Sequence, residues 1–234
     1  MSDGAPAPGD RTAIRDAATI VLVRDTEGPA PRVLMGQRGA GAAFMPNKFV
    51  FPGGALDPED AEIRLDAPLD ASMRRKLAAL PVTETMPSPE AMVAGAIREL
   101  WEEAGLMLGR PGAWQGPLPD DWRAFAAAGM RPSPDALRYI FRAITPAGRP
   151  RRFDARFFLA DAAVIDADLD DFGRACEELS HLHWIEIAEA RRLDLPFITE
   201  VVLAEAEEVL RRGLPETVPF FDNSGPVSTF RRIG

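Results

Sequence analysis

Three glutamates lie close together in the segment 89–106, PEAMVAGAIRELWEEAGL. Glu102 and Glu103 follow Glu99 by three and four residues, so the three share one face of a helix. Like charges at this spacing repel by roughly 0.2–0.5 kcal/mol on an exposed helix, and a divalent cation between them would turn the repulsion into attraction. Carboxylate oxygens suit Mg²⁺ or Mn²⁺, and such ions bind phosphate and activate water. The simpler interpretation is a solvated face on which Arg98 pairs with Glu102.

The elements that must position these glutamates begin with their own helix. Ser88 can cap its N-terminus, Pro89 suits its first turn, and Gly105 is typical of a helix end. Its core face is predicted from apolar residues that recur with the helical period, Met92, Ala96 and Leu100. The sequence therefore predicts one unbroken helix over 89–104.

The remaining segments predict a mixture of strands and helices. Apolar and β-branched runs predict strands over 17–25, 31–38, 48–54, 151–162 and 181–187. Helical patterns cover 71–80, 120–129 and 198–213. Because the two kinds of element do not alternate regularly, they favour an α+β fold over a doubly wound sheet. We expect a disordered tail over 1–13 and a single domain over 14–234, with insertions at about 55–88 and 108–142.

Composition and charge narrow the class of partner. The chain has 234 residues and a formal net charge of −9, which argues against nucleic acid as a partner. The single cysteine, Cys176, excludes an intramolecular disulfide and agrees with a reducing compartment. No apolar run approaches the roughly 20 residues that span a bilayer, and the polar start of the chain lacks the core of a secretory signal. We therefore expect a cytoplasmic protein with no membrane partner.

From Glu90 onward the sequence resembles the Nudix box, G-x5-E-x7-R-E-U-x-E-E-x-G-U, in which U is aliphatic. All eight fixed positions from Glu90 to Leu106 match. In the family the glycine lies six positions before the first glutamate, whereas Gly54 of the FPGG turn lies 36 positions before Glu90 (90 − 54). Pairing Gly53 with Glu59 satisfies the spacing but leaves 38 residues before the box arginine. We prefer Glu90, because the helix then stays unbroken and the insertion falls in a loop.

The resemblance implies an α/β/α sandwich with a mixed β-sheet and two helical insertions. It also implies hydrolysis, dependent on Mg²⁺ or Mn²⁺, of a nucleoside diphosphate linked to another moiety, giving a nucleoside monophosphate and a phosphorylated product. By position, the metal ligands would be Glu99, Glu102, Glu103 and the backbone of Gly54. Arg98 would orient Glu102 or Glu103, Glu90 would be structural or lie behind the ligands, and the turn at Gly53 and Gly54 would also face the substrate.

Two further segments resemble a subset of the family with a long insertion, the coenzyme A diphosphatases of the peroxisomal type. They are FMPNKFVFPGG (44–54) and AITPAGRPRRFDARFFLA (143–160). The fuller CoA signature, with a second arginine and a glycine before FPGG, is not matched between VLMGQR and FPGG. The sequence therefore leaves CoA, acyl-CoA, ADP-ribose and dinucleotides open as substrates.

Three charged residues outside the box are candidates for substrate binding or catalysis. Arg38 lies where family members often contact a phosphate, or is a surface arginine. Glu178, six residues before the tryptophan of HLHWIEI, is a candidate general base or extra metal ligand, or a solvated loop residue. Arg152, one of three arginines in the segment 151–156, suits a diphosphate or pairs with a nearby carboxylate.

The alternative function is a non-catalytic module that binds or senses a nucleotide. Such modules often lose a box glutamate or gain a DNA-binding domain, whereas this chain keeps every box glutamate and shows no basic helix-turn-helix segment. We therefore expect an enzyme that acts on a nucleotide-type small molecule, and a homodimer is an open expectation because many family members dimerise.

Overall fold

A computed structural model describes residues 13–42, 44–83 and 85–234, so the predicted tail lies outside the described residues except for its last position. A mixed sheet runs through the centre, in the order β11-β10-β7-β8-β1-β2-β3, with β4 beside β1 and β9 beside β2. Its strands are β1 (Ile14–Arg24), β2 (Arg32–Arg38), β3 (Phe49–Val50), β4 (Gly53–Ala55), β7 (Arg138–Ile144), β8 (Arg152–Asp161), β9 (Leu179–Glu186), β10 (Val218–Asp222) and β11 (Thr229–Ile233). The β1–β8 and β7–β10 pairs are parallel and the other pairs antiparallel.

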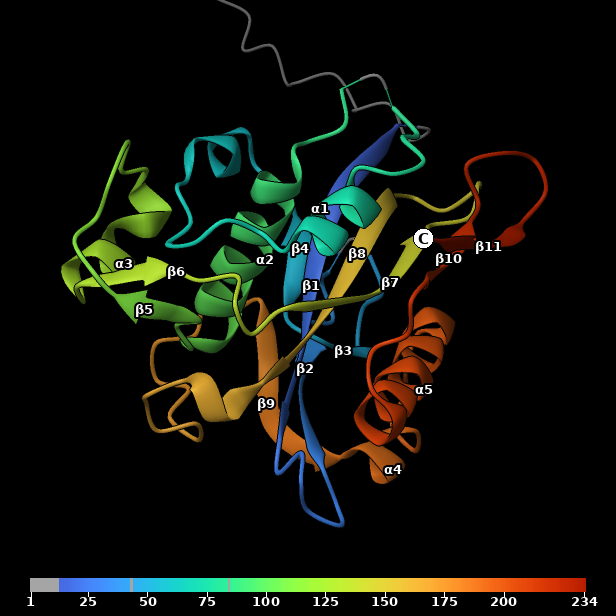
Figure 1. Ribbon diagram of the computed structural model, residues 1–234. Coiled ribbons are helices and arrows are strands. Elements are labelled where there is room, and N and C mark those ends of the chain that lie inside the picture. Colours follow the sequence, from blue (N-terminus) through green and yellow to red (C-terminus); the bar gives the residue numbers. More distant parts are fainter. Residues whose placement is uncertain (1–12, 43, 84) are drawn as a thin grey trace, which may run out of the picture.

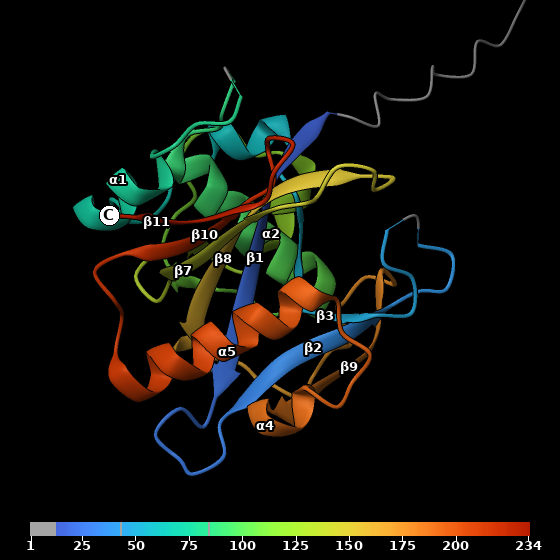
Figure 2. The same cartoon turned by 90° about the vertical axis from the view of Figure 1, so that its right-hand side faces the viewer.

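Helices cover both faces of this sheet (Figures 1 and 2). On one face lie α1 (Ala71–Leu77) and α2 (Pro89–Ala104), and on the other α4 (Ile187–Ala190) and α5 (Phe197–Arg212). Successive residues of a strand point to opposite faces. Ile20 and Leu22 of β1 therefore pack in the core under α2, while Val21 and Val23 pack in the core under α5. This arrangement confirms the α/β/α sandwich with a mixed sheet.

Helix α2 begins and ends where the sequence predicts. The Ser88 hydroxyl accepts a hydrogen bond from the backbone N–H of Ala91 at 3.1 Å. Gly105 follows the helix in the left-handed conformation, with φ of 71°, and its N–H donates to the carbonyl of Trp101 at 2.8 Å. Glycine adopts this conformation without the strain that a Cβ would cause. The helix thus holds its three glutamates in one continuous register.

The strand predicted over 48–54 is two short strands, β3 and β4, separated by Phe51 and Pro52. Proline has no N–H to donate to a ladder, but the carbonyl of Pro52 accepts from the N–H of Ile20 at 3.0 Å. Gly53 approaches β1 so closely that a Cβ on it would lie 2.6 Å from Cα of Thr19. The FPGG turn is therefore fastened against β1, directly beside α2.

The two excursions predicted at 55–88 and 108–142 contact each other. The first contains η1 (Pro58–Glu62) and α1, and the second contains β5 (Gly109–Pro111), η2 (Asp120–Trp122), α3 (Arg123–Ala127) and β6 (Met130–Pro132). The N–H of Asp66 donates to the carbonyl of Pro132, and the guanidinium of Arg131 donates to the carbonyl of Leu65, both at 2.9 Å. Residues 138–142 belong to β7 of the central sheet, so the second excursion is shorter than predicted.

Several short segments and the end of the chain carry no pattern from which an element was predicted. The structure adds β5, β6, α4, β10, β11 and the short helix η3 (Ala162–Val164). None of the helices in the described ranges has the length and apolar character of a transmembrane span.

Candidate active site

The candidate site is organised around the buried guanidinium of Arg98. Its Nε and Nη2 donate to the two carboxylate oxygens of Asp60 at 2.9 and 3.0 Å. Its Nη1 donates to Glu99 at 3.0 Å and to Glu102 at 2.9 Å, and Nη2 also donates to the carbonyl of Ala55 at 3.1 Å. A planar fork of donors suits such two-pronged binding of a carboxylate. Arg98 therefore joins α2 to the segment that follows the FPGG turn.

Asp60, the buried partner of Arg98, was not among the site residues predicted from the sequence. It lies six residues after Gly54 (60 − 54), which is the box spacing, with aspartate in place of glutamate. Its side chain is 1% exposed, and a Cβ on Gly95 of α2 would lie 2.8 Å from its carboxylate. Glu90, which the sequence analysis preferred for this position, instead pairs with Arg74 of α1 at 3.3 Å. The insertion therefore follows Asp60 rather than Gly54.

Glu99 and Glu103 contact the glycines of the turn. The N–H of Gly53 donates to one oxygen of Glu103 at 2.7 Å. A Cβ on Gly54 would lie 2.5 Å from each carboxylate oxygen of Glu99, so any other residue at this position would displace that carboxylate. Arg98 contacts Glu102, as predicted, but it does not hold Glu103, which Gly53 holds instead. The turn and the helix thus bring Glu99, Glu102 and Glu103 together.

Burial makes negative charge on these carboxylates costly. It raises the pKa of Glu99 to about 7, with Arg98 opposing and the charge of Glu102 adding to the shift. Burial and the neighbouring charge of Glu99 raise the pKa of Glu103 well above its ordinary value. Burial likewise raises the pKa of Glu102, against the opposing charge of Arg98. A cation beside these groups would favour their charged forms.

A divalent cation fits this set of donors. Carboxylate oxygens are hard ligands of the kind that Mg²⁺ and Mn²⁺ take, and one oxygen of Glu103 is buried without a hydrogen-bond partner in the described part of the chain. Within the described ranges, no three acidic, histidine or cysteine side chains already surround one point. The glutamate side chains would therefore turn toward an ion as it binds.

Arg38 and Glu178 lie beside the same carboxylates. Arg38 Nη2 is 2.8 Å from Glu178 Oε1. The charge of Glu178 raises the pKa of the Glu103 carboxyl, and the charge of Arg38 lowers it. The loop that carries Glu178 is fixed by the N–H of Cys176, which donates to the carbonyl of Glu102 at 2.7 Å. The structure thus brings together two residues predicted from position alone.

Arg152 is not part of this cluster. Its Nε donates to the carbonyl of Thr145 at 3.1 Å and its Nη2 to the carbonyl of Asn223 at 2.7 Å. In the sheet, Arg152 pairs with Ile14 of β1, whereas Gly53 pairs with Thr19, five residues further along β1. At about 3.3 Å a residue, that separation is roughly 16 Å along the strand. The basic segment 151–156 therefore does not contact the carboxylates as one group.

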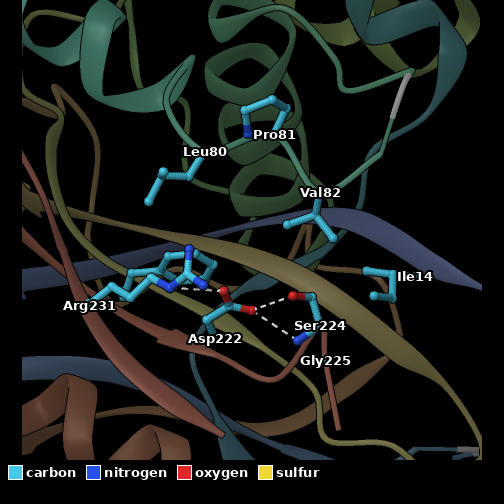
Figure 3. A pocket seen from close by; sticks show the side chains of 9 residues that line it. Ile14, Leu80, Pro81, Val82, Asp222, Ser224, Gly225 and Arg231 are labelled. Atoms are coloured by element: carbon cyan, nitrogen blue, oxygen red, sulfur yellow. Dashed lines mark hydrogen bonds and ion pairs between the residues drawn. The ribbon is translucent and has the colours of Figure 1, made fainter. Parts of the chain in front are cut away.

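A separate pocket of about 600 Å³ lies at the other end of the sheet (Figure 3). Leu80, Pro81 and Val82 face the end of β10, where Asp222 accepts hydrogen bonds from Ser224 and pairs with Arg231 of β11. None of the site residues predicted from the sequence lines this pocket.

Comparisons with known proteins agree with this geometry. No family model matches the chain. It is 32% identical over 190 residues to putative nudix hydrolase 7 of Caenorhabditis elegans, covering 75% of this chain and 52% of that protein. It is 30% identical over 251 residues to an acyl-coenzyme A diphosphatase of Homo sapiens, covering 79% and 67%. A Gallus gallus protein of the same name is 28% identical, covering 62% and 54%.

The fold comparison points to the same family. A crystal structure of a NUDIX hydrolase from Alicyclobacillus acidocaldarius superposes with a TM-score of 0.61 at 26% identity, covering 86% of this chain and 97% of that one. The chain belongs to the Nudix hydrolase family. It spans only about half the length of the first two curated relatives.

Proposed function

We propose that this chain is a pyrophosphohydrolase that depends on Mg²⁺ or Mn²⁺. Its substrate would be a nucleoside diphosphate linked to another moiety, and its products a nucleoside monophosphate and a phosphorylated compound. The observation that carries the proposal is the pair of buried carboxylates, Glu99 and Glu103, against the FPGG turn, with the partly exposed Glu102 on the same helix face. One oxygen of Glu103 has no hydrogen-bond partner among the described residues. Among the described residues, Glu103 forms no ion pair with a cationic side chain. A metal ion would supply the missing positive charge and would in turn bind a diphosphate.

The residues of the chain would divide the work as follows. Glu99, Glu102 and Glu103, with the backbone of Gly54 beside them, would hold the ion. When bound, a divalent cation neutralises the charge of a diphosphate and lowers the pKa of an attacking water. Arg98 is a positioning residue, because it holds Glu99 and Glu102 in place while it is itself held by Asp60. Glu178 is a candidate general base.

The names of the relatives support a CoA-type substrate as the first choice. Two of them are acyl-coenzyme A diphosphatases. CoA and acyl-CoA therefore head the candidates, followed by ADP-ribose and dinucleotides. A cytoplasmic location and a homodimer stay predictions.

A substrate panel tests the proposal. Purified protein is assayed with Mg²⁺ and with Mn²⁺ against CoA, acyl-CoA, NADH, ADP-ribose and dinucleoside polyphosphates, and release of nucleoside monophosphate is measured. We expect turnover of at least one compound, and its loss in Glu102→Gln and Glu103→Gln. Tight binding of a compound without turnover of any panel member would favour the non-catalytic module and overturn the proposal.

A further inference from the structure

A single ion pair joins Arg38 and Glu178 at the edge of the candidate site. Arg38 Nη2 lies 2.8 Å from Glu178 Oε1, and the two side chains are 19% and 54% exposed. Arg38 is paired with Leu179 across β2 and β9, and the Cys176 N–H is bonded to the carbonyl of Glu102 in α2. The ion pair therefore lies between the end of β2 and the C-terminal turn of α2.

Within the described residues, this ion pair joins Nη2 of Arg38 to Glu178 but does not reach its Nε. A carboxylate as exposed as that of Glu178 contributes little through an ion pair. The Nε of Arg38 is buried and has no hydrogen-bond partner in the described part of the chain. A guanidinium presents five N–H donors in a fork that matches phosphate oxygens. A phosphate would therefore satisfy donors that Glu178 does not reach.

We propose that a substrate phosphate displaces Glu178 from Arg38, so that this ion pair is a gate that opens when a diphosphate binds. The inference rests on the proposed function, because a diphosphate held through Glu99 and Glu103 would lie among the same charges. Arg38 then binds the phosphate, and Glu178 is released beside the carboxylates. In the free protein, Glu178 competes with the ligand for Arg38.

If Glu178 competes with the ligand for Arg38, removing the charge of Glu178 should strengthen ligand binding. This gain should depend on Arg38. The probe is α,β-methylene-ADP, a diphosphate that resists hydrolysis, titrated calorimetrically in Mg²⁺. We expect Glu178→Gln to lower its Kd about two- to fivefold, the size of a half-exposed ion pair. Arg38→Ala should raise the Kd, and adding Glu178→Gln to Arg38→Ala should bring no further change.

The chain offers two matched controls. Glu177→Gln removes the same charge from the neighbouring exposed residue. Asp170→Asn breaks the Arg24–Asp170 ion pair, which spans 2.9 Å with side chains 19% and 66% exposed. Like Arg38, Arg24 has a buried Nε without a hydrogen-bond partner among the described residues, although this Nε lies 4.0 Å from Asp25. Both controls should leave the Kd of the probe unchanged.

Two results would overturn the gate. One is a Kd that is unchanged or higher in Glu178→Gln. The other is a tightening that persists in the Arg38→Ala background, which would mean that loss of negative charge alone helps an anion to bind. Arg38→Gln replaces Arg38→Ala in this cycle if thermal unfolding shows that the alanine variant is not folded. Turnover of the substrate panel is measured separately. If Glu178→Gln lowers the Kd of the probe only when Arg38 is present, but no panel compound is hydrolysed, the proposed function fails and the gate stands. If a panel compound is hydrolysed but Glu178→Gln does not lower the Kd, the gate fails and the proposed function stands.

Discussion

At the residue scale, a single arginine arranges most of the candidate site. Arg98 divides its donors among Asp60, Glu99 and Glu102, whereas Glu103 is held by the backbone of Gly53. Glu99 and Glu102 are themselves candidate metal ligands. Because Arg98 positions them and Asp60 holds Arg98, the geometry of these ligands depends on Asp60, which is not a candidate ligand. Removing Asp60 would leave a buried guanidinium with less than its full set of partners.

The first prediction concerns Asp60, the buried ion-pair partner of Arg98. We expect Asp60→Asn to lower the free energy of unfolding by about 3 kcal/mol, because removing one partner of a buried ion pair leaves a charge uncompensated. It should also reduce turnover, since Arg98 would no longer fix Glu99 and Glu102. Urea unfolding and kcat measure the two effects. Glu90→Gln should leave kcat unchanged, because Glu90 pairs with Arg74 outside the site.

A matched control for this prediction is Asp57→Asn. Asp57 also lies near Arg98, at 3.4 Å, but its side chain is 46% exposed, so we expect a change below about 1 kcal/mol. Equal effects of Asp57→Asn and Asp60→Asn, or loss of turnover in Glu90→Gln, would contradict the role given to Asp60.

The second prediction concerns the contact between Gly54 and Glu99. A methyl group on Gly54 would meet both carboxylate oxygens at 2.5 Å, so Gly54→Ala must push Glu99 aside. A displacement of about 1 Å in a catalytic group can cost about 100-fold in rate, and we expect a loss of kcat of that order. Gly39→Ala is the control, because a Cβ there meets nothing within 4 Å. Similar kcat values for the two variants would show that Glu99 does not need this position.

The site residues divide into those that sequence could predict and those that it could not. Glu99, Glu102 and Glu103 share one helix, so local spacing was enough to group them. Asp60 escaped because its partner, Arg98, is 38 positions away (98 − 60) and because the box was expected to begin with glutamate. Arg152 was expected at the site on the ground of charge, although its hydrogen bonds tie it to Thr145 and Asn223.

At the element scale, prediction succeeded where local signals agree. Helix α2 carries its own cap, its own stop and a regular apolar face, and its bounds follow from these. The sequence of β10 argues against a strand, because Pro219 has no N–H to donate to a ladder of strand hydrogen bonds. It enters the sheet through two paired positions on β7, and its other neighbour is β11. Such pairing depends on residues about 80 positions away (220 − 142), so no local pattern encodes it.

The third prediction concerns Asp222, the last residue of β10. Burial opposes the charge of Asp222, but hydrogen bonds from the Ser224 hydroxyl and backbone N–H and the charge of Arg231 lower its pKa below the ordinary 3.8. A carboxyl with a lowered pKa stabilises the folded state above 3.8, and this contribution is lost as the pH falls through its folded value. Asp222→Asn should therefore cost about 1 kcal/mol at pH 5 and above.

Urea unfolding of wild type and Asp222→Asn at pH 7, 5 and 3 checks this prediction. The difference between the two proteins should be equal at pH 7 and 5 and smaller at pH 3. A difference that does not change with pH would mean that Asp222 contributes through its shape rather than through its charge.

At the scale of the whole molecule, the two excursions are part of the framework that supports the site. The first begins beside Asp60, which holds Arg98, and within it the carbonyls of Ala79 and Leu80 both accept from the buried Arg142 of β7 at 3.0 Å. The second is bonded to the first through Asp66. The insertion was expected to leave the spacing of the helix unchanged, and α2 is indeed unbroken. Long-range bonds of this kind could not be read from the composition of the excursions.

The last prediction joins the site to the stability of the whole chain. Residues of α2 and the FPGG turn meet at one group of buried carboxylates, so a cation bound there should stabilise the folded state against the unfolded one. An ion at 100 times its Kd adds about 2.7 kcal/mol, which for a chain of this length raises Tm by roughly 5–10 °C. Differential scanning calorimetry with Mg²⁺, with Mn²⁺ and with EDTA measures the shift.

Two variants of the same helix separate the site from the rest of the surface. Glu103→Gln should lose most of the metal-dependent rise in Tm, and it should melt higher than wild type in EDTA, because a buried charge without a cation is costly. Glu90→Gln removes an acidic group from the other end of α2 and should keep the full rise. An equal rise in all three proteins would place cation binding elsewhere and would remove the support that the carboxylate cluster gives to the proposed chemistry.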